Sequence, residues 1–287
     1  MNKKFISCFL IISVMCGLQG WKQKKPLAIN WQTNYRVKQS QLRYLNLRNI
    51  KLYKKPKALD LILSKHTHLI HLDLSGNYLG ELVDLSNLTQ LRYLDLGKTL
   101  LGGMNAEILE ELLLNISNLT QLQDLNLGKN FLGEKLKYLN LRNLTQLHSL
   151  DLSWNYLGRM KLEQFKEFGL SSLIQLHSLN LSDNYLDNNI ELLGLSNLTQ
   201  LHDLDISCNN LNTALDENPQ ALYIILSNLT QLHSLNLRGN CLGKKIELLG
   251  LSKLTKLRHL DLSDNYLDES QKKKLISLLP SSCEILF

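Results

Sequence analysis

The sequence predicts an α/β fold, an elongated solenoid with a parallel β-sheet on one side and helices or turns on the other. An eleven-residue frame with Leu at positions 1, 4, 6 and 11 and Asn at position 9 recurs nine times, as in Leu176–Leu186. Positions 4 and 6 alternate with polar positions 3, 5 and 7, which is the period of a half-buried strand. The copies begin 22 to 31 residues apart, too far for hairpins, so the strands should run parallel.

Composition agrees with one continuous core. The chain has 287 residues, 44% of them hydrophobic, and only four prolines, which excludes a disordered chain. A fully buried leucine contributes about 1.5–3 kcal/mol, but one repeat cannot cover its own apolar face, so the copies must stack on each other. The nine copies begin at Leu42, Leu69, Leu91, Leu122, Leu147, Leu176, Leu201, Leu232 and Leu257.

This frame resembles the leucine-rich repeat family over residues 42–267. The resemblance implies a right-handed horseshoe with a concave parallel sheet, convex helices or turns, and a ladder of position-9 amides that bond the backbone of adjacent turns. The expected ladder residues are Asn77, Asn130, Asn155, Asn184, Asn209, Asn240 and Asn265. Thr99 and Ile50 stand at position 9 in the third and first copies, so the ladder should weaken toward the N-terminal end.

From Leu91 onward, long and short spacings alternate, which resembles the ribonuclease-inhibitor-like subclass with helical convex segments. The long inserts predict helices over residues 105–116, 161–170 and 221–229. The short inserts have room for a turn or two of helix.

Residues 1–20 predict a secretory signal or an N-terminal anchor. Lys3 and Lys4 precede the largely apolar stretch Phe5–Val14, which is shorter than the roughly 20 residues of a spanning helix. We therefore expect a secreted, cell-surface or periplasmic protein. Cys16 leaves a membrane-anchored lipoprotein as the alternative.

The remaining segments are predicted to cap the array. Residues 21–41 form a basic N-terminal cap, and residues 268–287 form a C-terminal cap, with a helix that begins near Asp268 and stops at Pro280, followed by an edge strand. Residues 21–65 carry 12 Lys/Arg and one acid. This basic end could meet an anionic surface, although a solvated cap explains it as well.

Cysteine usage does not demand an oxidising compartment. Beyond residue 20 the chain has Cys208, Cys241 and Cys283, an odd number without a C-x-x-C pair. A bridge between Cys208 and Cys241 is possible from their places in adjacent repeats, but we do not expect it.

The candidate partner-binding residues lie in two polar columns that we expect on the concave face. Position 5 is always Asn or Asp, and position 2 holds four successive histidines, from His148 to His233. Trp154 stands at position 8, where it either anchors a partner or packs on the next turn. The expected contact residues are Asp95, Asp151, Trp154, His177, Asn180, His202, Asp205 and His233. An aromatic stripe at position 10 is interpreted as packing.

No metal, cofactor or catalytic centre is predicted. Histidines in a line do not converge on one ion as metal ligands must, and duplication of the repeat explains their column. The sequence lacks G-x-x-x-x-G-K-[ST], G-x-S-x-G and H-E-x-x-H motifs, and its carboxylates lie in regular columns instead of one convergent pair.

The sequence therefore predicts a non-enzymatic, exported module that binds a protein partner on its concave face, such as a bacterial surface or secreted effector-like protein. The alternative is carbohydrate or anionic-surface binding through the basic N-terminal end. We expect no nucleic-acid partner, and membrane contact only through the N-terminal segment.

Overall fold

The fold is one ten-stranded sheet in a computed structural model that describes residues 42–52, 56–80 and 83–287. The signal and N-terminal cap predicted over residues 1–41 lie outside the described residues. The strands are β1 (Tyr44–Asn46), β2 (His71–Asp73), β3 (Tyr93–Asp95), β4 (Asp124–Asn126), β5 (Ser149–Asp151), β6 (Ser178–Asn180), β7 (Asp203–Asp205), β8 (Ser234–Asn236), β9 (His259–Asp261) and β10 (Glu284–Leu286).

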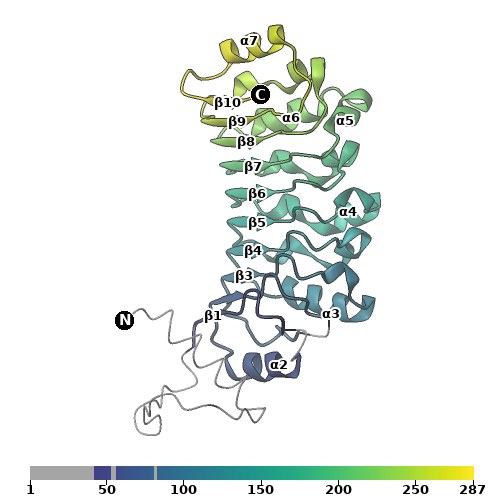
Figure 1. The fold of residues 1–287 in the computed structure, drawn as a ribbon, viewed down its shortest axis with the longest axis vertical. Helices are drawn as coiled ribbons and strands as arrows, with labels where there is room; N and C mark the ends of the chain where they lie inside the picture. The colour runs from purple at the N-terminus through teal and green to yellow at the C-terminus, as the bar shows by residue number, and fades with distance from the viewer. Residues whose placement is uncertain (1–41, 53–55, 81–82) are drawn as a thin grey trace, which may run out of the picture.

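All strands are parallel and stack in chain order, each on the next, as the spacing of the copies predicted. The stack is in register, so that each position-4 leucine pairs with its counterpart, for example Leu150 with Leu179. Figure 1 shows the strands along one side of an elongated molecule and the helices along the other. One face of the sheet is therefore covered by the return segments, and within the described residues no segment covers the opposite face, which we call the open face.

The core is a continuous column of leucines between the sheet and the return segments. The position-4 and position-6 side chains of every copy are 2% exposed or less. Phe165 and Phe168, from one long insert, are also buried in this column. Each repeat thus covers the apolar face of its neighbour, as repeat arrays require.

The return segments combine α-helices and 3₁₀-helices. The α-helices are α2 (Pro56–Lys65), α3 (Ala106–Ser117), α4 (Leu162–Phe168), α5 (Leu211–Glu217), α6 (Ala221–Asn228) and α7 (Glu269–Leu278). The 3₁₀-helices are η3 (Leu101–Gly103), η4 (Gly133–Tyr138), η5 (Leu141–Asn143), η6 (Leu157–Arg159), η7 (Leu170–Ser172), η8 (Asp187–Leu193), η9 (Leu195–Asn197), η10 (Gly243–Leu249) and η11 (Leu251–Lys253).

The long inserts form the predicted helices α3, α4 and α6, and the short inserts form 3₁₀ turns such as η10. Helix α2 was not predicted. Its buried residues Leu59, Ile62 and Leu63 follow the i, i+3, i+4 spacing of an amphipathic helix, and Pro56 begins it, as suits the first turn.

The position-9 asparagines lie between successive repeats. Asn184 is fully buried, and its Nδ2 donates to the carbonyl oxygens of Leu152, Leu181 and Ser182 at 2.9–3.2 Å. Its Oδ1 accepts the backbone N–H groups of Asn155 and Leu157, at 3.0 and 3.2 Å. One amide therefore satisfies the backbone of two adjacent turns, which would otherwise be buried without partners.

The third copy uses threonine in place of this amide. Thr99 Oγ1 donates to the carbonyl of Leu96 at 2.6 Å and lies 3.0 Å from Oδ1 of Asn130 in the next repeat. A hydroxyl can donate only one proton, so Thr99 cannot reproduce the paired donors of the asparagine.

The C-terminal end of the array carries helix α7 and strand β10. Asp268 begins α7 with a reciprocal capping box to Gln271, and β10 adds the last parallel strand beside β9. Cys208, Cys241 and Cys283 are all free thiols. Among the described helices none combines the length and apolarity that crossing a bilayer requires.

Candidate functional site on the open face

The outward side chains of the ten strands form a polar surface that we call the floor. It consists of the first and third residue of each strand, positions 3 and 5 of the frame, while the residue between them points into the core. Because the strands are in register, these side chains form two parallel columns about 4.8 Å apart from strand to strand.

The floor is acidic. Its carboxylates are Asp73, Asp95, Asp124, Asp151, Asp203, Asp205, Asp261 and Glu284, and neither column contains Lys or Arg. The full chain, in contrast, has a net charge of +6. On the floor, Nδ1 of His259 lies 3.3 Å from Oε2 of Glu284, an ion pair when the imidazole is protonated. Burial raises the pKa of Asp124, and burial with the nearby Asp73 raises the pKa of Asp95.

Position 5 has a backbone role in every repeat. Its Oδ1 accepts the N–H of position 7, two residues later, at 2.8–3.0 Å in all nine copies. This Asx turn ends each strand, and it explains why only Asn or Asp occurs there. The main role of position 5 is therefore to hold this turn through Oδ1, and only the second polar atom of the side chain, Oδ2 or Nδ2, is left for other contacts. This applies to the predicted contact residues Asp95, Asp151, Asn180 and Asp205.

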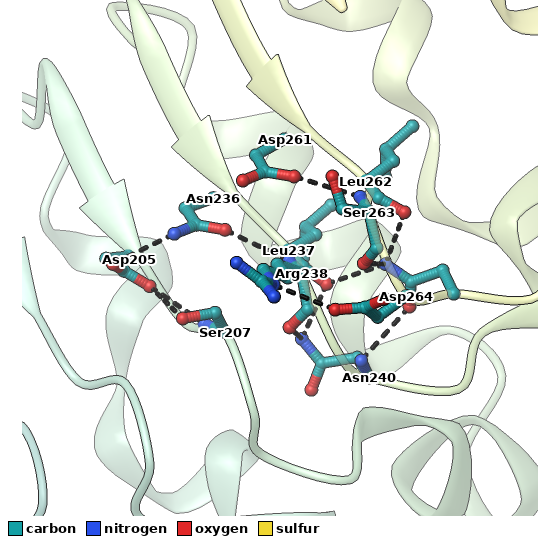
Figure 2. A network of polar contacts seen from close by, with 11 residues as sticks. Asp205, Ser207, Asn236, Leu237, Arg238, Asn240, Asp261, Leu262, Ser263 and Asp264 are labelled. Atoms are coloured by element: carbon teal, nitrogen blue, oxygen red, sulfur yellow. Dashed lines mark hydrogen bonds and ion pairs between the residues drawn. The ribbon is translucent and has the colours of Figure 1, made fainter. Parts of the chain in front are cut away.

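Figure 2 shows how this network extends across repeats near the C-terminal end. Asp205 accepts from the backbone and hydroxyl of Ser207 through Oδ1, and from Asn236 Nδ2 at 3.0 Å through Oδ2. Arg238, at the rim, pairs with Asp264 at 2.9 Å. The network fixes the position of the floor side chains before any partner binds, which lowers the entropy lost on association.

Position 3 carries the side chains that the sequence analysis did not select. Tyr44, Asp203, His259 and Glu284 are exposed there, and their side chains are not needed for the Asx turns. The alternation of the frame already placed position 3 on the same face as position 5, so this column could have been found from the pattern.

The four histidines of position 2 stack at the edge of the floor. Neighbouring rings from His148 to His233 have centroids 5.1–5.2 Å apart and planes within 16° of parallel. The Nδ1 atoms of His177, His202 and His233 are buried without a hydrogen-bond partner, so a binding partner cannot reach them directly. No group of three or more His, Cys, Asp or Glu among the described residues is arranged to hold a metal ion.

Trp154 lies at the rim beyond the floor, not within it. Its side chain is 39% exposed, and the ammonium of Lys129 in the preceding repeat lies 5.4 Å from its ring centroid. A shallow depression of about 230 Å³ lies at the C-terminal end of the floor, between β8 and β10. It is lined in part by Asn236, His259, Asp261 and Glu284.

A family model described as Leucine Rich Repeat matches residues 68–88 and 256–283. A leucine-rich-repeat protein of Leptospira interrogans is similar in structure, with a TM-score of 0.52 and 23% identity over 79% of this chain. The chain spans 57% of that protein's length. No curated protein matches the chain in sequence.

Two further bacterial structures are similar. An internalin (inlF) of Listeria monocytogenes has a TM-score of 0.49 and 26% identity, covering 85% of this chain and 67% of its own. The repeat protein LegL7 of Legionella pneumophila has a TM-score of 0.46 and 26% identity, and the match covers 69% of this chain and 66% of LegL7. The nine-copy frame, the in-register stack, the family-model match and the Leptospira structure show that the chain has a leucine-rich-repeat fold. The ribonuclease-inhibitor-like subclass stays a prediction.

Proposed function

We propose that this chain is an exported, non-enzymatic interaction module that binds a protein partner on its open face. The observation that carries the proposal is the floor itself, ten parallel strands in register that bring eight carboxylates and no Lys or Arg onto one face. Export rests on the signal-like sequence of residues 1–20.

The charge of the floor defines the partner's chemistry. Aligned carboxylates repel one another, and Arg48 and the nearby histidines offset this repulsion only locally, at Asp95 and Asp124. A ligand that brings positive charge relieves the rest of it. We therefore propose that the partner presents Lys or Arg side chains to the floor. The same charge disfavours a nucleic-acid partner, whose phosphates would be repelled.

The alternative function, binding of an anionic surface or carbohydrate, depends on the 12 Lys/Arg of residues 21–65. Eight of them lie outside the described residues or in a segment whose side chains are not described. This alternative uses a different part of the chain and the opposite ligand charge, so one experiment can separate the two.

The test measures binding of the full chain to a nona-arginine peptide by calorimetry at low ionic strength. A chain with net charge +6 should repel this peptide unless the floor attracts it locally. Reversing charge at Asp203→Lys and Glu284→Lys should weaken binding by about tenfold. These two residues are exposed and are not position-5 turn residues, so the fold should be retained.

The matched control is Glu110→Lys with Glu163→Lys, which makes the same charge change on the exposed surfaces of α3 and α4. Peptide binding should stay at the wild-type level in this variant. Equal weakening in both variants, or no binding by the wild type, would contradict the floor as the site. The alternative predicts that the wild type binds phosphatidylserine vesicles. It also predicts that neutralising the lysines and arginines of residues 21–65 abolishes this binding.

A further inference from the structure

A row of exposed aromatic rings runs along the edge of the sheet where the strands end. Phe131, Tyr156 and Tyr185 occupy position 10 in three successive repeats, with ring centroids 5.6 and 5.7 Å apart. Trp154 lies next to them at position 8 of the middle repeat. We call these four residues the aromatic ridge. Phe131 and Trp154 are 39% exposed and Tyr185 is 55% exposed, whereas Tyr156 between them is half-buried.

The backbone at these residues is unfavourable for large side chains. All four have positive φ, between 53° and 57°, the left-handed region in which a Cβ is crowded and which bulky residues rarely adopt. Strained conformations of this kind persist only when something outweighs their cost, and they cluster at functional sites. The same φ recurs at positions 8 and 10 of other copies, for example at Lys98, Leu100 and Cys241, so the repeat imposes the conformation and the rings are placed in it at a local cost.

The chain contains its own comparison for this position. Asn210 occupies position 10 in the seventh copy with the same φ of 55°, and asparagine is among the residues that tolerate this region best. The repeat thus folds with a small polar residue here. Stacking between the rings gives one reason to keep them, but their exposed surfaces leave room for a second.

The charges beside the ridge differ from those of the floor. Lys129 Nζ lies 5.4 Å from the centroid of Trp154, and Arg159 Cζ lies 4.6 Å from that of Tyr156. Lys98 stands at the same frame position as Lys129, one repeat earlier. Over residues 83–287, none of the salt bridges involves these three cations. Asp183, next along position 8, marks the end of this basic stretch.

We propose that the aromatic ridge is a second contact zone for the same protein partner, and that it receives an apolar segment carrying carboxylates. This inference rests on the proposed function, because it assigns the ridge to the same protein partner that binds the floor. Trp154 follows the floor residue Asp151 by three residues in one repeat, so a partner seated on the floor reaches the ridge by crossing the rim. Trp, Tyr and Arg are the side chains that dominate protein interfaces. The positive charges of Lys98, Lys129 and Arg159 beside the rings complement carboxylates.

Variants that remove the rings and suit a positive φ follow from Asn210 at position 10 and from Asn49 at position 8 of the first copy. Phe131→Asn, Trp154→Asn, Tyr156→Asn and Tyr185→Asn each place a residue suited to positive φ at a ridge position. If the rings serve binding, the combined variant should fold with a melting temperature within about 4 °C of the wild type. A much larger fall would show that the rings are held for packing and would overturn the proposal.

The binding test selects peptides from a random twelve-residue library displayed on phage, using the full chain. We expect one class of selected peptides to be rich in apolar residues and Asp or Glu. These peptides should bind the wild type and the floor variant Asp203→Lys/Glu284→Lys equally well. They should bind the combined Asn variant of the aromatic ridge, the ridge variant, at least about tenfold more weakly. A second class, rich in Lys or Arg, should show the opposite dependence.

The outcomes separate the two proposals. If the floor variant loses the basic peptides and no class of peptide depends on the ridge, the proposal for the aromatic ridge is overturned and the proposal for the floor stands. A ridge-dependent class with no floor-dependent class would overturn the floor and the shared partner. Ridge binders rich in Lys or Arg would refute the proposed charge of the segment, and no enrichment of any peptide would refute both zones.

Discussion

Asparagine at position 9 of the frame joins each repeat to the one before it. Its amide donates to carbonyls of its own turn and of the preceding turn, and its oxygen accepts two backbone N–H groups there. Aspartate would lose the donors, and threonine at position 99 keeps only one. The identity of the residue therefore follows from the need for donors and an acceptor on one short, buried side chain.

Asn184→Ala tests this role. The substitution leaves two backbone N–H groups and a cross-repeat carbonyl without side-chain partners, and we expect it to lower the free energy of unfolding by about 1–3 kcal/mol. Chemical denaturation followed by circular dichroism measures the change. The exposed Asn188→Ala should change the free energy by less than about 0.5 kcal/mol, and an equally small effect at Asn184 would contradict the ladder.

At the scale of elements, three-residue strands and single turns of 3₁₀-helix are stable only because they stack. The close approach of consecutive turns also restricts residue size. A Cβ on Gly158, in η6, would lie 1.7 Å from the carbonyl oxygen of Tyr185 in the next repeat. Because that oxygen belongs to the backbone, it cannot move aside without separating the repeats.

Gly158→Ala should therefore overpack this seam and lower the free energy of unfolding by about 1–3 kcal/mol. Gly103→Ala is the matched control, since a Cβ there would meet nothing within 4 Å and the residue lies in η3, also at the end of a frame. Thermal unfolding of both variants measures the difference. Similar melting temperatures for the two would show that the repeats are not packed as closely as described.

The leucine frame was enough to predict the strands, their parallel order and one helix in each long insert, because each of these follows from periodicity and spacing. Helix α5, which precedes α6 in the insert of the seventh copy, was not predicted. Helix α2 was missed because the sequence analysis treated residues 53–65 as part of a basic end, although Leu59, Ile62 and Leu63 have helical spacing. Local pattern shows which face a residue takes. It does not show the contacts between repeats, which are set by segments 22 to 31 residues apart.

The candidate site was predictable only in part for the same reason. The position-5 column was found, but its hydrogen bonds to position 7 involve two residues of one turn and could have been anticipated from the preference of Asn and Asp for such turns. The stacking of the histidines and the exposure of the aromatic ridge required the structure. Both depend on how side chains from adjacent repeats meet.

At the scale of the whole molecule, in-register stacking turns a local pattern into a surface. One acid per strand would attract little on its own, but ten strands in order bring eight carboxylates onto one face of a chain whose net charge is positive. The hydrogen bonds of the turns and the ladder hold this face in place. Binding by several shallow contacts across a rigid sheet suits a macromolecular partner better than a small ligand.

Carboxylate labelling with a carbodiimide and an amine, read by mass spectrometry with and without bound nona-arginine peptide, tests the central claim most directly. The account predicts that the peptide protects Asp203, Asp261 and Glu284 on the floor and leaves Glu110 and Glu163 on the convex helices equally reactive. Protection of the convex glutamates, or unchanged labelling of the floor at saturating peptide, would contradict it.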